Sequence, residues 1–490
     1  MRPAALLQRA SALALVTALA ACSSSSGGGV TPSGGGDGGD GATSSGDGTG
    51  GGESTGGPSG GTGGGAVACD NEMYAPKDGT VVWARKMTCG QPVGAARSPD
   101  GATIGVGFTA VGAPTLYANG LLDFAAAGSD NVVASMRRDG MFTWFASITG
   151  NAEVTKVAAA NDGGVAGAGW FDVKATIGGV DVTSTDDTIS EGFVARYDGS
   201  ATAATVATFA APSGVQWSDV YSLSFDAAGL LTIGGAAEGG VMHVGSLSLA
   251  PPSPSSYSAL LASFDSSGQA IWGARFGDAA SVQTVAAGAG GVVYTLGSFE
   301  EGLDLGGGFT AQGTARALPF LAAFDATGAP LWLQTFSKAV VAVDLQVDDA
   351  GEAFLFATVS GEADFGDGAS EPVGASDVAI AKYAADGTLA WVERYDAEGI
   401  VGAAAFAVTS DGRAIVAEPH ASDLRLRTLG ADGTFAHPTR VFPGFATVST
   451  LTPLTTGDVL LVGGFTRALT LGSLALTTRT SGSYLAVVTP

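Results

Sequence analysis

The chain has 490 residues, of which 46% are hydrophobic and only 14% charged, with 77 glycines. Its 22 basic and 46 acidic residues give a net charge of −24, which argues against nucleic-acid binding, because contact with phosphates requires a basic surface. No apolar run reaches the roughly 18–20 residues of a membrane-spanning helix. The chain's three cysteines are too few for a disulfide-built scaffold.

The N-terminus has the pattern of an export signal. Residues 1–21 combine two arginines with an apolar stretch over 11–21 that is too short to cross a bilayer. The segment ends in LAAC, which resembles the bacterial lipobox, an aliphatic and two small residues before a cysteine. The resemblance implies a lipoprotein signal peptide over 1–21, a lipidated Cys22, and an outer-membrane lipoprotein that is periplasmic or surface-exposed. The alternative is an ordinary secretory peptide with a chance cysteine.

The segment that follows predicts a tether. Residues 22–66 are almost wholly Gly, Ser, Thr, Asp and Pro after the first cysteine, with no aromatic residue, Lys or Arg. Such a chain cannot bury enough apolar surface to offset its conformational entropy, so we expect a disordered linker. The folded domain is therefore expected over residues 67–490.

The folded part is a tandem repeat of about 60 residues. The strings RRDGMFTWFASITG, FDSSGQAIWGARFG, FDATGAPLWLQTFS and YAADGTLAWVERYD align, each with a Gly turn followed by a Trp. Within a unit, four apolar runs bounded by Gly and Asp predict four short strands, and the Asp and Gly suit tight hairpin turns. Repeated units of four antiparallel strands predict an all-β fold, the β-propeller.

Counting the strands in chain order predicts how the ring closes. Thr80–Met87 has the character of a fourth strand but has no third strand before it. Six complete sets follow over residues 92–443, and the last set supplies only three strands, at 447–456, 459–465 and 483–490. We therefore expect a seven-bladed β-propeller of four-stranded blades, closed by the N-terminal strand, since closure removes exposed sheet edges.

These units resemble those of bacterial propeller-repeat surface lipoproteins, a seven-bladed group. The group carries the same D-x-x-G-x-x-x-W hairpin and a G-x-F at the end of the second strand, here Gly297-Ser298-Phe299 in one unit. The resemblance covers about residues 79–490. The resemblance implies the propeller architecture but says little about the protein's activity.

The connections between second and third strands predict a binding face. They are long and variable, for example at 172–191 and 236–257, and they lie on one side of the predicted ring. The alternative is that they only thicken the rim. On this side Trp217 is a candidate for stacking on a ligand or for simple packing. Asp186 and Asp187 could bind Ca²⁺ weakly, although a solvated acidic loop is the alternative because no D-x-D-x-D-G loop accompanies them.

Other notable side chains have structural interpretations. Five tryptophans at one repeat position are expected to pack between neighbouring blades: Trp83, Trp144, Trp272, Trp332 and Trp391. The three histidines, His243, His420 and His437, lie at no ligand spacing, so no metal site is predicted.

The two cysteines that remain beside Cys22 predict a disulfide. Cys69 and Cys89 form an even pair in an exported chain, and a bond between them would staple the entry segment next to the closing strand. The alternative is two free thiols.

We expect a non-catalytic, monomeric binding or scaffold module for a protein or polysaccharide of the cell envelope, attached to the membrane by its lipid alone. No catalytic residue and no cofactor are predicted, apart from weak Ca²⁺. The alternative is an envelope enzyme, glycan-active or quinoprotein-like, with its site in the axial mouth of the propeller. Convergent carboxylates or arginines at that mouth would favour the enzyme, and an aromatic-bearing loop face would favour the binding module.

Overall fold

The computed structural model describes most of the chain beyond residue 70: 71–75, 79–87, 90–110, 115–118, 121–125, 130–185, 189–209, 215–253, 256–314, 316–436 and 438–490. The chain divides into two units, Met1–Ala66 and Val67–Pro490, and every described residue belongs to the second. Several predictions concern residues outside these ranges: Cys22, Cys69, Cys89, Asp186, Asp187 and His437. None of the described residues forms a helix with the length and hydrophobicity needed to span a bilayer.

The fold is all-β, as predicted. Among the described residues the helical structure is a single 3-10 turn, η2 (Ala289–Gly291). Third strands such as β11 (Ser190–Tyr197) and β27 (Asp377–Tyr383) are buried along their whole length. This burial explains their continuous apolar runs, because both faces of these strands are covered.

Four consecutive repeats each form a four-stranded antiparallel sheet in chain order. The first is β13 (Val215–Phe225), β14 (Leu231–Gly239), β17 (Tyr257–Phe264) and β18 (Ala270–Phe276). The second is β19 (Ala280–Ala287), β20 (Val293–Phe299), β23 (Leu318–Phe324) and β24 (Pro330–Thr335). The third is β25 (Val340–Val347), β26 (Ala353–Val359), β27 and β28 (Leu389–Asp396). The fourth is β29 (Ala405–Val408), β30 (Ala414–Pro419), β31 (Asp423–Leu429) and β32 (Arg440–Pro443).

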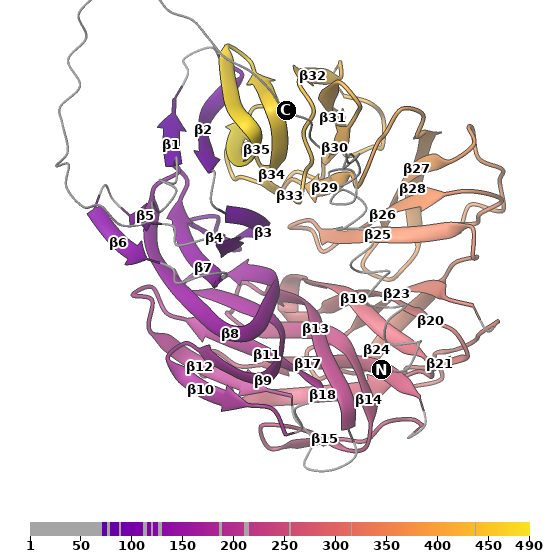
Figure 1. The fold of residues 1–490 in the computed structure, drawn as a ribbon. Helices are drawn as coiled ribbons and strands as arrows, with labels where there is room; N and C mark the ends of the chain where they lie inside the picture. The colour runs from indigo at the N-terminus through magenta and orange to yellow at the C-terminus, as the bar shows by residue number, and fades with distance from the viewer. Residues whose placement is uncertain are drawn as a thin grey trace, which may run out of the picture. The chain divides into compact units, whose positions relative to one another are not determined.

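The two repeats before these share one continuous strand, which the sequence did not predict. Their strands are β3 (Gly90–Arg97), β4 (Thr103–Ala110), β7 (Asn131–Arg137), β8 (Phe142–Ala159), β9 (Val165–Ile177), β10 (Val180–Thr183), β11 and β12 (Ala203–Thr208). The first half of β8 pairs with β7 and the second half with β9, so β8 runs from one repeat into the next (Figure 1). Gly150, with φ of 95°, lies where the ladder shifts register, which lets the strand turn there.

The last sheet joins the two ends of the described chain. Its order is β1 (Asn71–Tyr74), β2 (Val81–Met87), β35 (Leu474–Val488), β34 (Val459–Leu471) and β33 (Thr450–Pro453). β2 lies beside β35, with Trp83 paired to Val487 (Figure 1). This is the pairing that was predicted for Thr80–Met87. β1 adds a fifth strand that the sequence analysis missed.

Most long connections between second and third strands contain small hairpins, as at β5 (Thr115–Ala118) with β6 (Leu121–Ala125), β15 (Met242–Val244) with β16 (Leu247–Leu249), and β21 (Gly302–Asp304) with β22 (Thr310–Gln312). Met242 and Val244 are fully buried in a cluster with sheet residues. At least the β15–β16 hairpin therefore packs on its sheet through these two side chains.

Neighbouring sheets contact one another through their first strands. The contacts run from β3 to β8, β13, β19, β25, β29 and β33, and β33 contacts β3. At the last contact, the Thr452 hydroxyl donates to the Ala95 carbonyl at 2.9 Å. Between two other sheets, the rings of Phe356 and Phe406 stack with centroids 5.2 Å apart. The hydrophobic core therefore lies largely between sheets.

The repeat tryptophans pack between sheets, as predicted. Trp83 Nε1 donates to the Arg138 carbonyl at 2.7 Å, and that carbonyl lies in a turn of the next sheet. Trp332 and Trp391 make the corresponding bond to turn carbonyls of their own neighbours, each at 2.9 Å. These side chains are part of the scaffold.

Candidate functional site

Trp217 lies at the start of β13 beside a second aromatic residue. Its half-buried indole donates from Nε1 to Glu238 Oε2 at 2.7 Å. Its ring centroid is 6.1 Å from that of Tyr257, with the planes tilted by 38°. The indole thus has one edge engaged by a carboxylate while part of its surface stays accessible, an arrangement suited to stacking.

A buried arginine positions the segment around this aromatic pair. Arg275, near the end of β18, donates from Nη2 to the Ala237 carbonyl at 2.8 Å and from Nη1 to the Gly239 and Gly240 carbonyls at 3.1 and 2.6 Å. Its Nε donates to Ser258 Oγ at 2.9 Å. Burial lowers the pKa of Arg275 to about 10. The guanidinium therefore holds the chain on both sides of Glu238 and the residue that follows Tyr257.

Sequence analysis missed Arg275 as a site residue. The residue lies in the string GARFG, which reads as an ordinary outer strand, and the carbonyls that it binds are more than 30 residues away. No local pattern connects the two segments, so only the folded chain could reveal this role.

The chain leading to the predicted acidic pair is also anchored. Glu191 is 1% exposed, and its Oε1 accepts hydrogen bonds from the Thr185 amide at 2.7 Å and the Thr185 hydroxyl at 2.6 Å. Asp186 and Asp187 follow directly but lie outside the described residues, so their role in Ca²⁺ binding stays a prediction.

A second polar cluster surrounds a fully buried carboxylate. Glu418 accepts from Tyr395 Oη at 2.7 Å and from Arg427 Nε at 2.8 and 3.0 Å. Burial, followed by the charge of Glu418, raises the pKa of Tyr395 well above its usual value. His420 Nε2 lies 3.7 Å from Glu418 Oε2. His420 thus lies beside a cluster of Glu418, Tyr395 and Arg427 that the sequence did not reveal.

Two opposite charges lie on first strands of separate sheets. Asp344 on β25 accepts from its neighbours, the Leu345 amide at 2.9 Å and Gln346 Nε2 at 3.1 Å. Burial raises the pKa of Asp344, and the positive charge of Lys156 on β8 opposes that shift. Lys156 is therefore near enough for its charge to act on Asp344.

The described side chains contain no group of three or more His, Cys, Asp or Glu placed to hold a metal ion. His243 Nδ1 lies 3.1 Å from the Ser248 hydroxyl.

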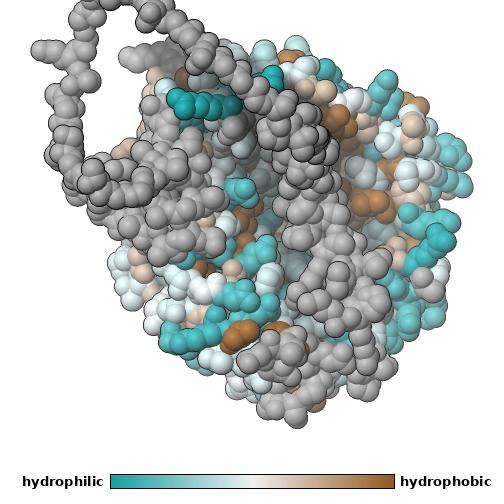
Figure 2. Space-filling model, in the orientation of Figure 1, coloured by the Kyte–Doolittle hydropathy of each residue, from teal (hydrophilic) through white to brown (hydrophobic). Residues whose placement is uncertain are grey.

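The described surface has no single dominant hydrophobic area in view. Figure 2 shows hydrophobic residues in small separate groups among hydrophilic ones. Several exposed apolar side chains come from outer strands, as with Val82, Ile271, Leu331 and Val441. Isolated apolar residues of this kind are normal on soluble surfaces.

No protein-family model and no curated protein matches this chain. Among solved structures, it is similar to the Dos1 propeller, with 8% identity over 82% of this chain and 93% of that chain and a TM-score of 0.42. It is also similar to an ulvan lyase of polysaccharide lyase family PL25, at 10% identity, 80% and 93% coverage and TM-score 0.42. A third is the Pan2 WD40 domain of Neurospora crassa, at 9% identity, 82% and 90% coverage and TM-score 0.40. Identity and TM-score are both low, so no substrate or partner is carried over.

Proposed function

We propose that this chain is a seven-bladed β-propeller closed by β2, which acts as a non-catalytic binding or scaffold module for a protein or polysaccharide of the cell envelope. The serial contacts of the first strands, which return from β33 to β3, support the ring. The pairing of β2 with β35 supports its closure. A lipid on Cys22 would attach this monomeric module to the outer membrane, on its periplasmic or outer side.

The observation that carries the binding function is the anchored pair of Trp217 and Tyr257. Arg275 and Glu238 hold the surrounding backbone and the indole edge, so little conformational entropy is lost when a ligand stacks there. Aromatic faces stack on sugar rings and pack against apolar side chains of proteins. The net charge of −24 disfavours an acidic ligand, so we favour a neutral polysaccharide or a neutral or basic protein surface.

The test is crosslinking and capture of the lipidated protein from its own membranes, read by mass spectrometry. We expect a reproducible partner for the wild type and at least a tenfold loss for Trp217→Ala. Val373→Ala is the matched control, because Val373 is 72% exposed on another long connection. Unchanged capture by Trp217→Ala would contradict the proposed surface. A Cys22→Ser protein that still fractionates with membranes would contradict the lipid anchor.

The enzyme alternative retains one specific observation, the opposite charges of Lys156 and Asp344 on first strands that would line the axial mouth. It predicts release of product from an envelope glycan by the wild type and no release by Asp344→Asn. Equal activity of the two proteins would remove this candidate.

A further inference from the structure

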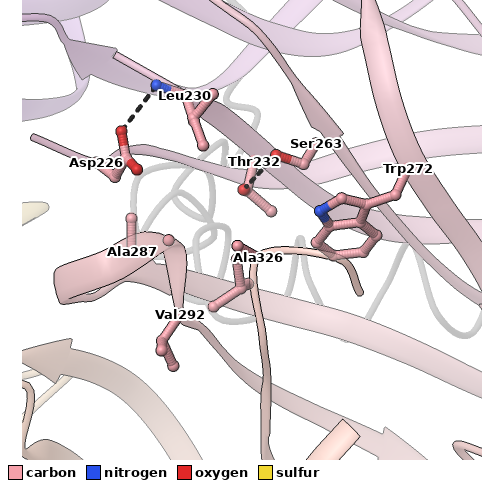
Figure 3. A pocket seen from close by; sticks show the side chains of 10 residues that line it. Asp226, Leu230, Thr232, Ser263, Trp272, Ala287, Val292 and Ala326 are labelled. Atoms are coloured by element: carbon pink, nitrogen blue, oxygen red, sulfur yellow. Dashed lines mark hydrogen bonds between the residues drawn. The ribbon is translucent and has the colours of Figure 1, made fainter. Parts of the chain in front are cut away.

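A small pocket lies between two neighbouring sheets. Its polar lining comes from Asp226, Thr232 and Ser263 of the sheet β13–β14–β17–β18, and Trp272 of the same sheet and Ala326 of the next one close it (Figure 3). The space is about 10 Å³, which is about what one water molecule needs. The pocket can therefore hold one ion or molecule of about the size of water, and no larger ligand.

The repeat supplies an internal comparison for this pocket. Ser263 on β17 pairs with Thr232 on β14. At the same register position of its own sheet, Lys382 on β27 pairs with Phe354 on β26. In another sheet this position is Arg196, which forms an ion pair with Asp162 at 2.5 Å. Two repeats thus place a cation where this repeat has a short hydroxyl side chain.

The carboxylate that faces this position is the same in two repeats. Asp348 begins the turn after β25, accepts from the Ala350 and Glu352 amides through Oδ1, and places Oδ2 3.7 Å from Lys382 Nζ. Asp226 begins the turn after β13 and accepts in the same way from the Ala228 and Leu230 amides, at 2.9 and 2.8 Å. The two aspartates are therefore structural equivalents.

Asp226 differs from Asp348 in lacking its cation. Asp226 is 8% exposed, and no Lys, Arg or His of the described chain forms an ion pair with it. Figure 3 shows its second carboxylate oxygen, which is not bonded to Leu230, directed into the pocket. A buried carboxylate without a counter-charge is costly. In the other repeat Lys382 stands at the register position of Ser263 and pairs with both Asp348 and Glu352, and the counterpart of Glu352 in this repeat is Leu230.

We propose that this pocket binds a small monovalent cation, held by the Asp226 carboxylate and the hydroxyls of Thr232 and Ser263. These oxygens are hard ligands, suited to an alkali ion or to the hydrogen-bonding protons of an ammonium group. The size of the pocket admits K⁺, Na⁺, ammonium or the head of a primary amine, and excludes a quaternary ammonium. Bound there, the cation takes the place of the missing lysine and ties the turn after β13 to β14 and β17 of the same sheet.

The test is the thermal midpoint at constant ionic strength, with tetramethylammonium chloride replaced stepwise by KCl, NaCl, NH₄Cl or methylammonium chloride. We expect a saturable rise of about 2 °C for the wild type, because a ligand that binds only the folded state stabilises it. Asp226→Asn should abolish the response. Asp198→Asn, in an exposed turn, is the matched control and should keep it.

Ser263→Lys gives the converse test, since it supplies the ammonium covalently. We expect this variant to have a higher midpoint and no remaining cation response. A response to K⁺ or Na⁺ assigns a free ion, whereas a response to methylammonium alone assigns an organic amine such as a lysine side chain.

Two outcomes would overturn the proposal: an equal response of wild type and Asp226→Asn, which is a general salt effect, or no response in the wild type. If Asp226→Asn does not fold, crystals of the wild type grown with Rb⁺ replace that arm. An anomalous peak bounded by Asp226, Thr232 and Ser263 is then expected, and no peak there contradicts the site.

Discussion

Gly387 lies directly against the indole ring of Trp332 in the neighbouring sheet: a Cβ atom added to Gly387 would be 2.7 Å from Cδ2 of that ring. Trp332 Nε1 also donates to the Ala385 carbonyl of the same turn, at 2.9 Å. The relationship recurs at Gly140 with Trp83, Gly328 with Trp272, and Gly433 with Trp391. The glycine of the repeated turn is therefore required by its neighbour as well as by its own backbone, which has φ of 83° at Gly387.

Gly387→Ala is expected to lower the free energy of unfolding by about 3 kcal/mol, the sum of left-handed backbone strain and overpacking against the indole. Gly229→Ala is the matched control, because Gly229 has φ of 84° and a Cβ atom added to it would meet nothing within 4 Å. The control should cost only about 1 kcal/mol. Urea unfolding measures both, and equal losses would show that the tryptophan contact does not matter.

Ala201 occupies the glycine position in one of these turns, with φ of 67°. The tryptophan that corresponds to this turn, Trp144, is buried and its Nε1 has no hydrogen-bond partner among the described residues. Ala201→Gly should therefore stabilise the protein by about 1 kcal/mol, since it removes backbone strain. Ala227→Gly, in an exposed turn without positive φ, is the control and should be neutral or destabilising. A loss of stability for Ala201→Gly in thermal unfolding would contradict this interpretation.

The turn aspartates predict a specific acid sensitivity. A hydrogen bond from the Ser267 hydroxyl, with further bonds from backbone amides, lowers the pKa of Asp265. A carboxyl with a lowered folded pKa contributes stability above its unfolded pKa of about 3.9, and that contribution is lost as pH falls through the folded pKa. Hydrogen bonds also lower the pKa values of four other turn aspartates: Asp198, Asp325, Asp386 and Asp432.

Asp265→Asn should therefore be less stable than the wild type at about pH 6, and the two proteins should converge as pH falls below about 4. Urea unfolding across this acid range measures the difference. Glu371→Gln is the control, because Glu371 is exposed and takes part in no hydrogen bond of the described chain. Parallel curves for Asp265→Asn and wild type across this range would refute the capping role.

The pairing of β1 with β2 bears on the disulfide prediction. Asn71 pairs with Met87, and each stands two positions in the sequence from one of the cysteines, Cys69 and Cys89, which themselves lie outside the described residues. We expect Cys69 and Cys89 to resist alkylation in the unfolded protein until a reductant is added, as read by mass spectrometry. Alkylation of both thiols without reductant would disprove the bond.

The candidate site was predicted only in part. The sequence pointed to Trp217 as a candidate for stacking or packing on the predicted binding side, and the structure adds its partners Glu238 and Tyr257. Arg275 could not be predicted, because its acceptors are carbonyls on a different strand and a carbonyl has no signature in the sequence. The continuous β8 was also missed, since the Gly150 region reads as a turn between two units.

The sequence by itself determined the all-β class, the four-stranded repeat and the place of the N-terminal strand beside the C-terminal one. It did so because turn residues and strand patterns act over a few neighbouring positions and recur about every 60 residues. Only the tertiary structure decided which side chains meet between sheets. Asp226 and Ser263 have no distinguishing pattern in the sequence. The pocket beside the Asp226 carboxylate can be recognised only in the folded protein, because residues from separate turns and strands line it.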